Sequence, residues 1–359
     1  MKFERLRIQG LRCLTDVTVT LGEGIHVFVG SNGAGKTSVL EAAYLLSHGR
    51  SFRSGAREAL MQRGQAGLSV FAEVQDESGG YRRLGLGRSG TRWDARLDGI
   101  DVPLGQLVQA CAVVCFEPGS HALIAGAAEE RRRFLDWGVF HVEHTFLAVW
   151  RRYQRALKQR NALLRMGEAG TNELYEPWER ELGDAGAIID NYRRSYLDRL
   201  LPVLAEGASY LLPELGPLSL RYRRGWADDA SLSGVLAEQR GRDLARTHTT
   251  AGPHRADWSL SFEQAPLREH LSRGQEKLAA LACLLAQAQL YANCRGDWPV
   301  VCLDDLASEL DLAHQSALVD RLASVDAQVL ITGTECPLPL QSRPHRVFHV
   351  EQGKIRPLL

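Results

Sequence analysis

An eight-residue run near the amino terminus has the composition of a phosphate-binding loop. The run reads Gly30, Ser31, Asn32, Gly33, Ala34, Gly35, Lys36 and Thr37, which fits the pattern G-x-x-x-x-G-K-[ST]. Its glycines allow backbone N–H groups to turn toward phosphate oxygens, while Lys36 reaches the β- and γ-phosphates and the Thr37 hydroxyl binds Mg²⁺. Apolar residues precede the run, and a helix over 38–47 is expected to begin with Ser38 and to favour an anion at its start. The pattern predicts ATP and Mg²⁺ as cofactors of residues 30–38.

Two adjacent carboxylates follow a second apolar run. Residues 300–303 are all apolar, as in a parallel strand that is buried on both faces. Asp304 and Asp305 come at its carboxyl end, where α/β sheets bind ligands. Asp304 is predicted to bind Mg²⁺ together with Thr37, and Asp305 to polarise the attacking water. An apolar strand that ends in two aspartates is common, but its place downstream of a phosphate loop makes it informative.

The segment Leu271-Ser272-Arg273-Gly274-Gln275 has two interpretations. Locally, Ser272 is a helix N-cap and Gln275 completes a capping box, with leucines lining one face of the helix that follows. The segment also resembles the signature of the ATP-binding-cassette ATPases, in which these residue types contact the γ-phosphate held by the opposite subunit. That resemblance implies that Ser272, Gly274 and Gln275 act in trans, and that ATP joins two copies of the chain in a homodimer.

The chain departs from the cassette pattern in three places. Asp305 stands where these ATPases usually have a glutamate, and Ile331-Thr332-Gly333-Thr334 stands where they have a switch histidine. Both departures predict slow hydrolysis. No Q-loop glutamine is recognisable, and Glu117 is the candidate for that place. Ser308-Glu309-Leu310-Asp311 falls where the D-loop follows the aspartate strand.

Residues 131–208 are predicted to form an antiparallel helical hairpin. Apolar and aromatic residues recur at helical spacing over 146–164 and again over 174–200, with a break at 167–172. Each helix would be about 40 Å long at 1.5 Å per residue. The aromatic stripe is interpreted as the seam between the helices rather than as a platform for stacking bases. The sequence therefore predicts an α/β, ABC-type P-loop ATPase head, residues 1–130 and 209–359, with an inserted helical arm at 131–208.

Four local patterns resemble the RecF family of SMC-like ATPases. Lys36 and Ser272 lie 236 residues apart (272 − 36), a separation that the short inserted arm explains. The family patterns are Arg12 after a leucine, Ser51-Phe52-Arg53, residues 132–136 and, most distinctive, residues 250–257, which read TAGPHRAD. Taken singly, each could be an ordinary turn or a loop with one buried aromatic. Taken in order, they extend the resemblance over 1–359, with a departure at 126–128, where Gly-x-Pro is expected.

The resemblance implies a role in DNA repair. Members of the family bind DNA when loaded with ATP, dimerise head to head, and work with RecO and RecR to load recombinase at single-strand gaps. It implies a weak, DNA-stimulated ATPase of recombinational repair and replication restart, with a part in SOS induction and with sequence-independent binding to a gap or junction. The candidates for phosphate contacts are basic residues of the arm: Arg131, Arg132, Arg151, Arg152 and Arg155. Pairing of these charges within the hairpin is the alternative.

Composition narrows the class of protein. The 359 residues are 45% apolar and 24% charged with a net charge of zero, typical of a soluble globular chain and uninformative about nucleic acid. No apolar run reaches the roughly 18 residues of a membrane helix, and the charged start carries no export signal, so a cytoplasmic protein without a membrane partner is expected. The seven scattered cysteines indicate reduced thiols. Two alternatives stay open: an ATP-gated structural DNA clamp with negligible hydrolysis, and the ATPase subunit of a transporter, against which the inserted arm argues.

Overall fold

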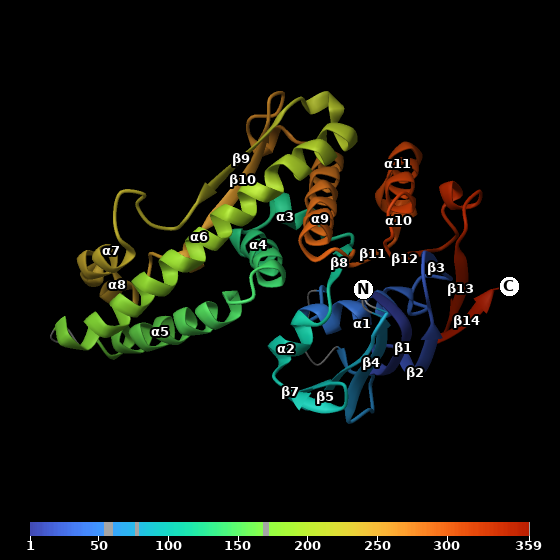
Figure 1. The fold of residues 1–359 in the computed structure, drawn as a ribbon, viewed down its shortest axis with the longest axis horizontal. Coiled ribbons are helices and arrows are strands. Elements are labelled where there is room, and N and C mark those ends of the chain that lie inside the picture. Colours follow the sequence, from blue (N-terminus) through green and yellow to red (C-terminus); the bar gives the residue numbers. More distant parts are fainter. Residues whose placement is uncertain (54–59, 76–78, 168–171, 359) are drawn as a thin grey trace. The chain divides into compact units, whose positions relative to one another are not determined.

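The computed structural model describes residues 1–53, 60–75, 79–167 and 172–358 (Figure 1). The chain forms two compact units. The first combines Met1–Ser120 with Leu281–Leu359, and the second is His121–Ala280. Both boundaries of the predicted arm, 130 and 208, fall inside the second unit, and the three-part division remains a prediction. Within the described ranges, none of the helices combines the length and the apolar character needed to cross a bilayer.

An antiparallel sheet forms one layer of the first unit. Its strand order is β2-β1-β4-β5-β6-β7. The strands are β1 (Lys2–Leu11), β2 (Leu14–Thr20), β4 (Gly67–Gln75), β5 (Tyr81–Ser89), β6 (Arg92–Leu97) and β7 (Ile100–Val102). Buried and exposed residues alternate along β2, where Val17 and Val19 point inward and Thr18 and Thr20 outward. One face of this sheet is therefore available to cover a core.

The second sheet of this unit is mostly parallel, in the order β14-β13-β3-β12-β11-β8. The strands are β3 (Ile25–Val29), β8 (Val113–Phe116), β11 (Val300–Leu303), β12 (Val329–Gly333), β13 (Arg346–Glu351) and β14 (Lys354–Leu358). All residues of β11 are buried, as the apolar run predicts. β13 and β14 pair antiparallel as a closing hairpin, and the other neighbouring strands pair parallel. Because β3, β12 and β11 are parallel neighbours, their carboxyl ends meet at one edge.

Helix α1 (Lys36–His48) belongs to a core that both sheets share. Ala42, Ala43, Leu45 and Leu46 are fully buried, so the helix contributes apolar side chains all round. The helix that begins at the phosphate loop is therefore fixed on several sides. The other helices wholly within this unit are α2 (Leu104–Gln109), α10 (Leu306–Glu309) and α11 (Leu312–Ala323), with a 3₁₀ turn at Leu338–Leu340.

The second unit is built around a helical hairpin. Its helices are α3 (Ala122–Ala125), α4 (Ala128–Val142), α5 (Phe146–Met166), α6 (Asn172–Leu211), α7 (Leu232–Glu238) and α8 (Arg240–Arg246). The 23-residue helix α9 (Arg273–Arg295) begins in this unit. The predicted hairpin is present, since α5 packs along α6 (Figure 1). Its arms are unequal: 21 residues make α5 about 32 Å long, and 40 residues make α6 about 60 Å long. Of the predicted break at 167–172, residues 168–171 lie outside the described residues.

The aromatic stripe of the arm lies in the seam between α5 and α6, as predicted. Phe146, Tyr153 and Leu164 of α5 are buried, as are Leu182 and Ile189 of α6. At the start of α6 the predicted stripe is wrong by one position, since Leu174 is 44% exposed and Tyr175 is the buried residue. The buried rings of Phe146, Tyr153 and Tyr175 are therefore not available for base stacking.

A buried ion network ties the arm to α7 and α8. Arg160 of α5 is fully buried and donates to Asp243 Oδ2 at 2.6 Å and to Glu179 Oε1 at 3.2 Å. The same guanidinium donates to the Leu236 carbonyl at 2.9 Å, while Arg240 bonds the other oxygen of Glu179 at 2.7 Å. Charges removed from water in this way are tolerated only when fully paired, so the network fixes how α8 lies against the arm.

Replacing Arg160 should therefore destabilise the second unit strongly. Arg160→Met keeps most of the side-chain volume but leaves Asp243 and Glu179 buried with fewer partners, at an expected loss of about 3–5 kcal/mol in the free energy of unfolding. The matched control is Arg152→Met, which removes an exposed pair with Glu181 and should lose less than about 1 kcal/mol. Urea unfolding followed by tryptophan fluorescence measures both, and equal losses would show that burial of the network is unimportant.

Candidate nucleotide-binding site

The phosphate loop connects β3 to α1 and packs closely on the β13–β14 hairpin. Gly30 has φ 156°, and a Cβ there would lie 2.1 Å from the Val350 carbonyl oxygen, so no side chain fits. Gly35 precedes α1 at φ 113°, a conformation that favours glycine. Gly353 of the hairpin turn donates its N–H to the Ala34 carbonyl at 2.9 Å. The predicted strand, loop and helix are present, and residues 31–33 are exposed at the loop's tip.

Lys36 lies folded over the loop that it follows. Its side chain is largely buried, and Nζ donates to the carbonyls of Gly30 at 2.8 Å and Ser31 at 2.9 Å. An ammonium group held at the concave side of the loop is positioned to bind an anion that the backbone N–H groups enclose. Ser38, one position into the helix beyond Thr37, is buried, and its N–H donates to the Gly35 carbonyl.

Three polar side chains meet at the carboxyl edge of the parallel sheet. Asp304 follows β11, Thr332 lies near the end of β12, and Thr37 lies in the first turn of α1, after β3. The hydroxyl of Thr37 donates to Asp304 Oδ1 at 2.8 Å, and the hydroxyl of Thr332 donates to the same oxygen at 2.6 Å. The strand order places β12 between β3 and β11, which explains why Thr332 reaches Asp304.

The oxygen atoms of this cluster fit a Mg²⁺ ion. Burial raises the pKa of Asp304, although hydrogen bonds from Thr332 and Thr37 and the charge of Arg53 act in the opposite direction. A carboxylate that loses water in this way is stabilised by a cation. The described residues contain no group of three or more His, Cys, Asp and Glu side chains that could enclose a metal. That suits Mg²⁺, which is usually held by one or two protein oxygens together with water and nucleotide phosphates.

Asp305 adopts a left-handed backbone conformation, φ 55° and ψ 44°, as the residue before α10. Its N–H donates to Thr332 Oγ1 at 2.9 Å, so the hydroxyl that bonds Asp304 also fixes the next residue. Aspartate tolerates this conformation better than most residues. The role of Asp305 in polarising water remains a prediction.

Glu41 is a feature of the site that the sequence analysis did not identify. It is fully buried on α1, one turn after Thr37, and receives both arms of the Arg12 guanidinium at 2.7 and 3.0 Å. The Ser51 hydroxyl also donates to it, and Arg53 lies within 3.9 Å. The feature of the sequence that could have identified Glu41 is its position as the one acidic residue among the apolar residues of α1. Glu41 therefore explains two of the family patterns, because it holds Arg12 and residues 51–53 beside the phosphate loop.

The signature segment begins α9 in the second unit. The capping box is present: the Gln275 N–H donates to Ser272 Oγ at 3.3 Å, and the Ser272 N–H donates to Gln275 Oε1 at 3.0 Å. Ser272, Arg273 and Gly274 are exposed. The capping box predicted from the local sequence is therefore present. The contact of Ser272, Gly274 and Gln275 with a γ-phosphate held by a second subunit remains a prediction.

The places of the missing cassette residues are filled differently. Thr332, at the expected position of the switch histidine, bonds Asp304 as described. Glu117 accepts the Gly119 N–H at 2.7 Å and so shapes its own turn, while its Q-loop role stays a prediction. In the expected D-loop, Ser308 donates to the Asp305 carbonyl and Asp311 caps α11.

The arginines proposed for phosphate contacts divide into two groups. Arg131 donates to both oxygens of Asp257, at 2.7 and 3.1 Å, and Arg132 donates to the Ala256 carbonyl at 2.9 Å. Arg152 pairs across the hairpin with Glu181. Arg151 and Arg155, in contrast, are exposed on α5, one helical turn apart and in line with Lys158. The alternative of pairing within the hairpin therefore holds for Arg152, while Arg131 and Arg132 bond to the segment before and at the start of β10 (Asp257–Phe262).

The contacts of Thr332 predict a defect in Mg²⁺ dependence. Thr332→Val keeps the shape of the side chain but removes the hydroxyl that orients Asp304, so the apparent affinity for Mg²⁺ in nucleotide binding should fall about 10–100-fold. Fluorescent ATP binding titrated with Mg²⁺ measures the effect. The control is Thr18→Val, an exposed threonine of β2, which should match the wild type. A wild-type Mg²⁺ dependence in Thr332→Val would show that the hydroxyl does not orient the carboxylate.

Comparison with known sequences covers nearly the whole chain. Residues 2–356 match the family described as "RecF/RecN/SMC N terminal domain". A protein of Stenotrophomonas maltophilia (strain R551-3) named DNA replication and repair protein RecF is 48% identical over 99% of each chain. A protein of the same name from Xanthomonas axonopodis pv. citri (strain 306) is 49% identical over 99% of this chain and 98% of its own.

Solved structures agree on the fold. A structure of RecF with ATP superposes with a TM-score of 0.90 at 24% identity, covering 99% of this chain and 97% of the other. An SMC head bound to the C-winged helix domain of ScpA gives a TM-score of 0.60 at 15% identity, covering 100% and 98%. The predicted α/β, ABC-type ATPase head with an inserted arm is confirmed, and this chain belongs to the RecF family of SMC-like ATPases.

Proposed function

We propose that this protein is an ATP-dependent DNA-binding protein of recombinational repair and replication restart. In this proposal it binds ATP with Mg²⁺, dimerises, hydrolyses ATP slowly under stimulation by DNA, and works in the cytoplasm. It would help to load recombinase at single-strand gaps with RecO and RecR, and thereby support SOS induction. The names of its relatives, DNA replication and repair proteins, support this role.

The observation that carries the proposal is the contact of Thr37 and Asp304 at 2.8 Å beneath the phosphate loop. The hydroxyl and the carboxylate come from segments 267 residues apart, yet the parallel sheet brings them together. Bound ATP would lie along the N–H groups of residues 31–36 with Lys36 against its terminal phosphates. Mg²⁺, held by Thr37 and Asp304, would neutralise charge on those phosphates.

Dimerisation is proposed because the start of α9 has the features of an anion-binding helix end. A helix of 23 residues has a positive amino-terminal end, and its first residues, Ser272 to Gly274, are exposed. The γ-phosphate bound by Lys36 of one copy would be contacted by Ser272 of the partner. Such an arrangement makes ATP part of the interface, so dissociation would follow hydrolysis.

DNA binding is proposed to be ionic and independent of sequence. The net charge is zero, so the contacts must come from local groups of cations. Arg151, Arg155 and Lys158 form one such group along α5. The partly buried Arg131 and Arg132 are left out of this part of the proposal, because their guanidinium groups bond residues 257 and 256.

The substitution Ser272→Asp separates the proposed contact of Ser272 with the partner's γ-phosphate from its capping of α9. Aspartate is as good an N-cap as serine, so the helix should be retained. Its negative charge would oppose the partner's γ-phosphate, so the ATP-induced dimer seen by sedimentation should be lost while each monomer still binds ATP. ADP should give monomers for both proteins.

The control for this change is Ser195→Asp, an exposed serine on α6, which should dimerise with ATP like the wild type. A dimer that forms equally well in Ser272→Asp would contradict the contact in trans and leave the segment with its capping role alone. Lys36→Ala serves as the variant that should fail to bind ATP.

Hydrolysis can be tested through Asp305. Asp305→Asn should keep ATP binding and the dimer but lower phosphate release about a hundredfold, since a carboxylate that polarises the attacking water contributes at least that much. Phosphate release is measured with and without a gapped duplex. If the wild type releases phosphate no faster than Asp305→Asn in both conditions, the ATP-gated clamp with negligible hydrolysis is the better description.

A further inference from the structure

The segment 249–257 is held by contacts from four helices of the second unit: α4, α5, α6 and α8. Thr249 donates its N–H and hydroxyl to Asn161 Oδ1, at 2.8 and 2.7 Å. Thr250 donates in the same way to Asp243 Oδ1, at 3.1 and 2.6 Å. The Pro253 carbonyl accepts a bond of 2.7 Å from the buried Arg193. The backbone of this segment is therefore fixed.

His254 belongs to the same set of internal contacts. Its Nε2 lies 3.1 Å from the Thr249 carbonyl oxygen. Because a carbonyl oxygen can only accept, Nε2 carries the proton. The other ring nitrogen, Nδ1, then accepts a hydrogen bond of 2.6 Å from the Tyr153 hydroxyl. Burial lowers the pKa of His254 to about 4, with the nearby Arg255 and Arg132 acting in the same direction. The ring is thus a neutral structural group, and it is not a candidate for binding an anion.

Arg255 differs from its neighbours in this segment. Its side chain is exposed, and no hydrogen bond or ion pair joins it to any of the residues that the structure describes. Ala256 and Asp257, the next two residues, are bonded by Arg132 and Arg131. Because the backbone at Arg255 is already fixed, little main-chain entropy would be lost when its guanidinium binds a ligand.

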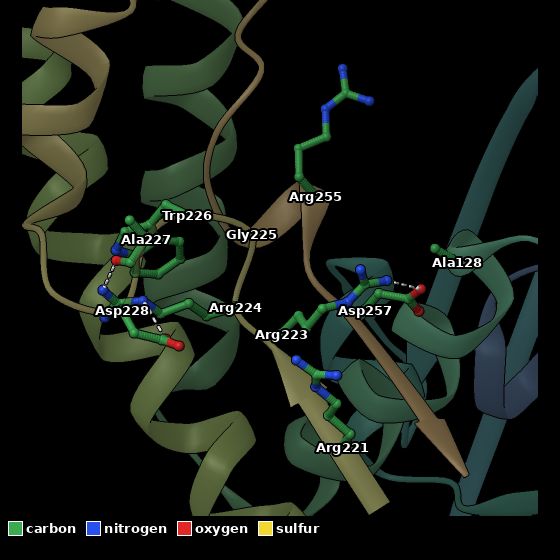
Figure 2. A pocket seen from close by; sticks show the side chains of 10 residues that line it. All are labelled: Ala128, Arg221, Arg223, Arg224, Gly225, Trp226, Ala227, Asp228, Arg255 and Asp257. Atoms are coloured by element: carbon green, nitrogen blue, oxygen red, sulfur yellow. Dashed lines mark hydrogen bonds and ion pairs between the residues drawn. The ribbon is translucent and has the colours of Figure 1, made fainter. Parts of the chain in front are cut away.

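Arg255 lines a cavity of about 580 Å³ on the outer face of the two-stranded sheet β9 (Leu218–Arg223) and β10. Figure 2 shows Arg221 and Arg223 projecting from one strand and Arg255 from the segment before the other. Arg224 and Trp226 close one side of the cavity, and Ala128 at the start of α4 lies opposite them. The cavity is much larger than a single phosphate group, and its size falls within the range of binding sites for small organic ligands.

The alternation of β9 places two of these arginines on the same exposed face. Arg221 and Arg223 are exposed while Tyr222 between them faces inward, so their Cα atoms lie about 6.6 Å apart along the strand. Ser259 of β10 pairs with Arg221 and is exposed beside it. The spacing is comparable to that of successive phosphates in an extended nucleic-acid strand.

The acidic residues of the cavity do not neutralise these arginines. Asp257 is bonded at both oxygens by Arg131, and its contact with the 71% exposed Arg223 is longer, at 3.4 Å. Asp228 faces Arg224, which also stacks over Trp226 at 4.5 Å. Arg221, like Arg255, has no ion pair with any described residue. The cavity therefore presents unused donors and positive charge.

We propose that Arg221, Arg223 and Arg255 form a phosphodiester-binding site on the outer face of β9–β10. Guanidinium forks match the geometry of phosphate oxygens. The two carboxylates that line the cavity, Asp257 and Asp228, each lie beside an arginine already. The site would contact the backbone of a nucleic-acid strand without reading its bases. The inference rests on the proposed function, because it assumes that DNA is bound. It assigns part of that binding to a surface distinct from the group of Arg151, Arg155 and Lys158 on α5.

The test compares DNA binding by the wild type and Arg221→Ala/Arg255→Ala in the presence of ATP. Fluorescence anisotropy with a labelled single strand, a duplex and a gapped duplex should show binding weakened about tenfold for each arginine removed. For the single strand, the slope of log K against log salt should become shallower by about 1.4, at about 0.7 per phosphate contact. The matched control is Arg242→Ala, an exposed arginine of α8, which should stay within about twofold of the wild type.

Each result has a distinct meaning, given thermal melting and ATP binding that match the wild type. If the wild type binds DNA and the double variant binds equally well, the site is wrong while the proposed function stands. If the wild type binds no nucleic acid, the proposed function itself fails. If free nucleotides or pyrophosphate compete as strongly as an oligonucleotide of equal phosphate concentration, the cavity is a small-anion site. If a polyglutamate peptide binds the wild type but not the double variant, and DNA binding is unchanged, the cavity is a site for an acidic protein segment.

Discussion

One carboxylate oxygen organises the candidate nucleotide site. Oδ1 of Asp304 accepts hydrogen bonds from the hydroxyls of Thr37 and Thr332. Thr37 lies in the first turn of α1, after β3, and Thr332 lies near the end of β12. The arrangement rests on parallel strands in the order β3-β12-β11, because their carboxyl ends then lie along one edge, where Asp304 can bond both Thr332 and Thr37. That sheet is stable because α1 and the antiparallel sheet cover its apolar side chains in one shared core. The positions of Asp304, Thr37 and Thr332 at the carboxyl edge of the parallel sheet therefore depend on the packing of the whole first unit.

A second constraint is the burial of charge in the inserted unit. Arg160 and Arg193 are fully buried, and each is paired with a carboxylate and a backbone carbonyl. Both arginines hold residues of the segment 236–253, which returns from α7 and α8 toward β10. Because a buried guanidinium that loses its partners is very unfavourable, the path of this segment has few alternatives. This is a physical reason for the distinctive composition of residues 249–257: the side chains of Thr249, His254 and Asp257 bond residues of α5 and α4, while Arg255 is exposed.

The sequence predicted those parts of the fold whose causes are local. The glycine spacing of the phosphate loop, the apolar run before Asp304 and the helical period of the arm each follow from backbone geometry and burial, and each is present. Glu41 and Thr332 were not predicted as site residues because their partners, Arg12 and Asp304, lie 29 and 28 residues away and meet them only in the folded sheet. The position of Tyr175 in the seam, where Leu174 was expected, reflects the start of α6, and a change of one residue there rotates the helix by about 100°. The internal bonds of Arg131 and Arg132 were not predicted for the same reason as those of Glu41: a charge pattern in a sequence does not show which carboxylates and carbonyls the fold brings near.

The two interpretations of Ser272 need not compete. A hydroxyl has one proton to donate and two lone pairs that accept. In the capping box, Ser272 Oγ only accepts, from the Gln275 N–H, and Gln275 in turn accepts the Ser272 N–H. The hydroxyl proton is left for an outside acceptor, and the exposed residues Arg273 and Gly274 leave room for one at the positive end of α9. The cap holds the hydroxyl in place at the helix start, so a local feature that stabilises an isolated helix also prepares the group that a phosphate of a second subunit would meet.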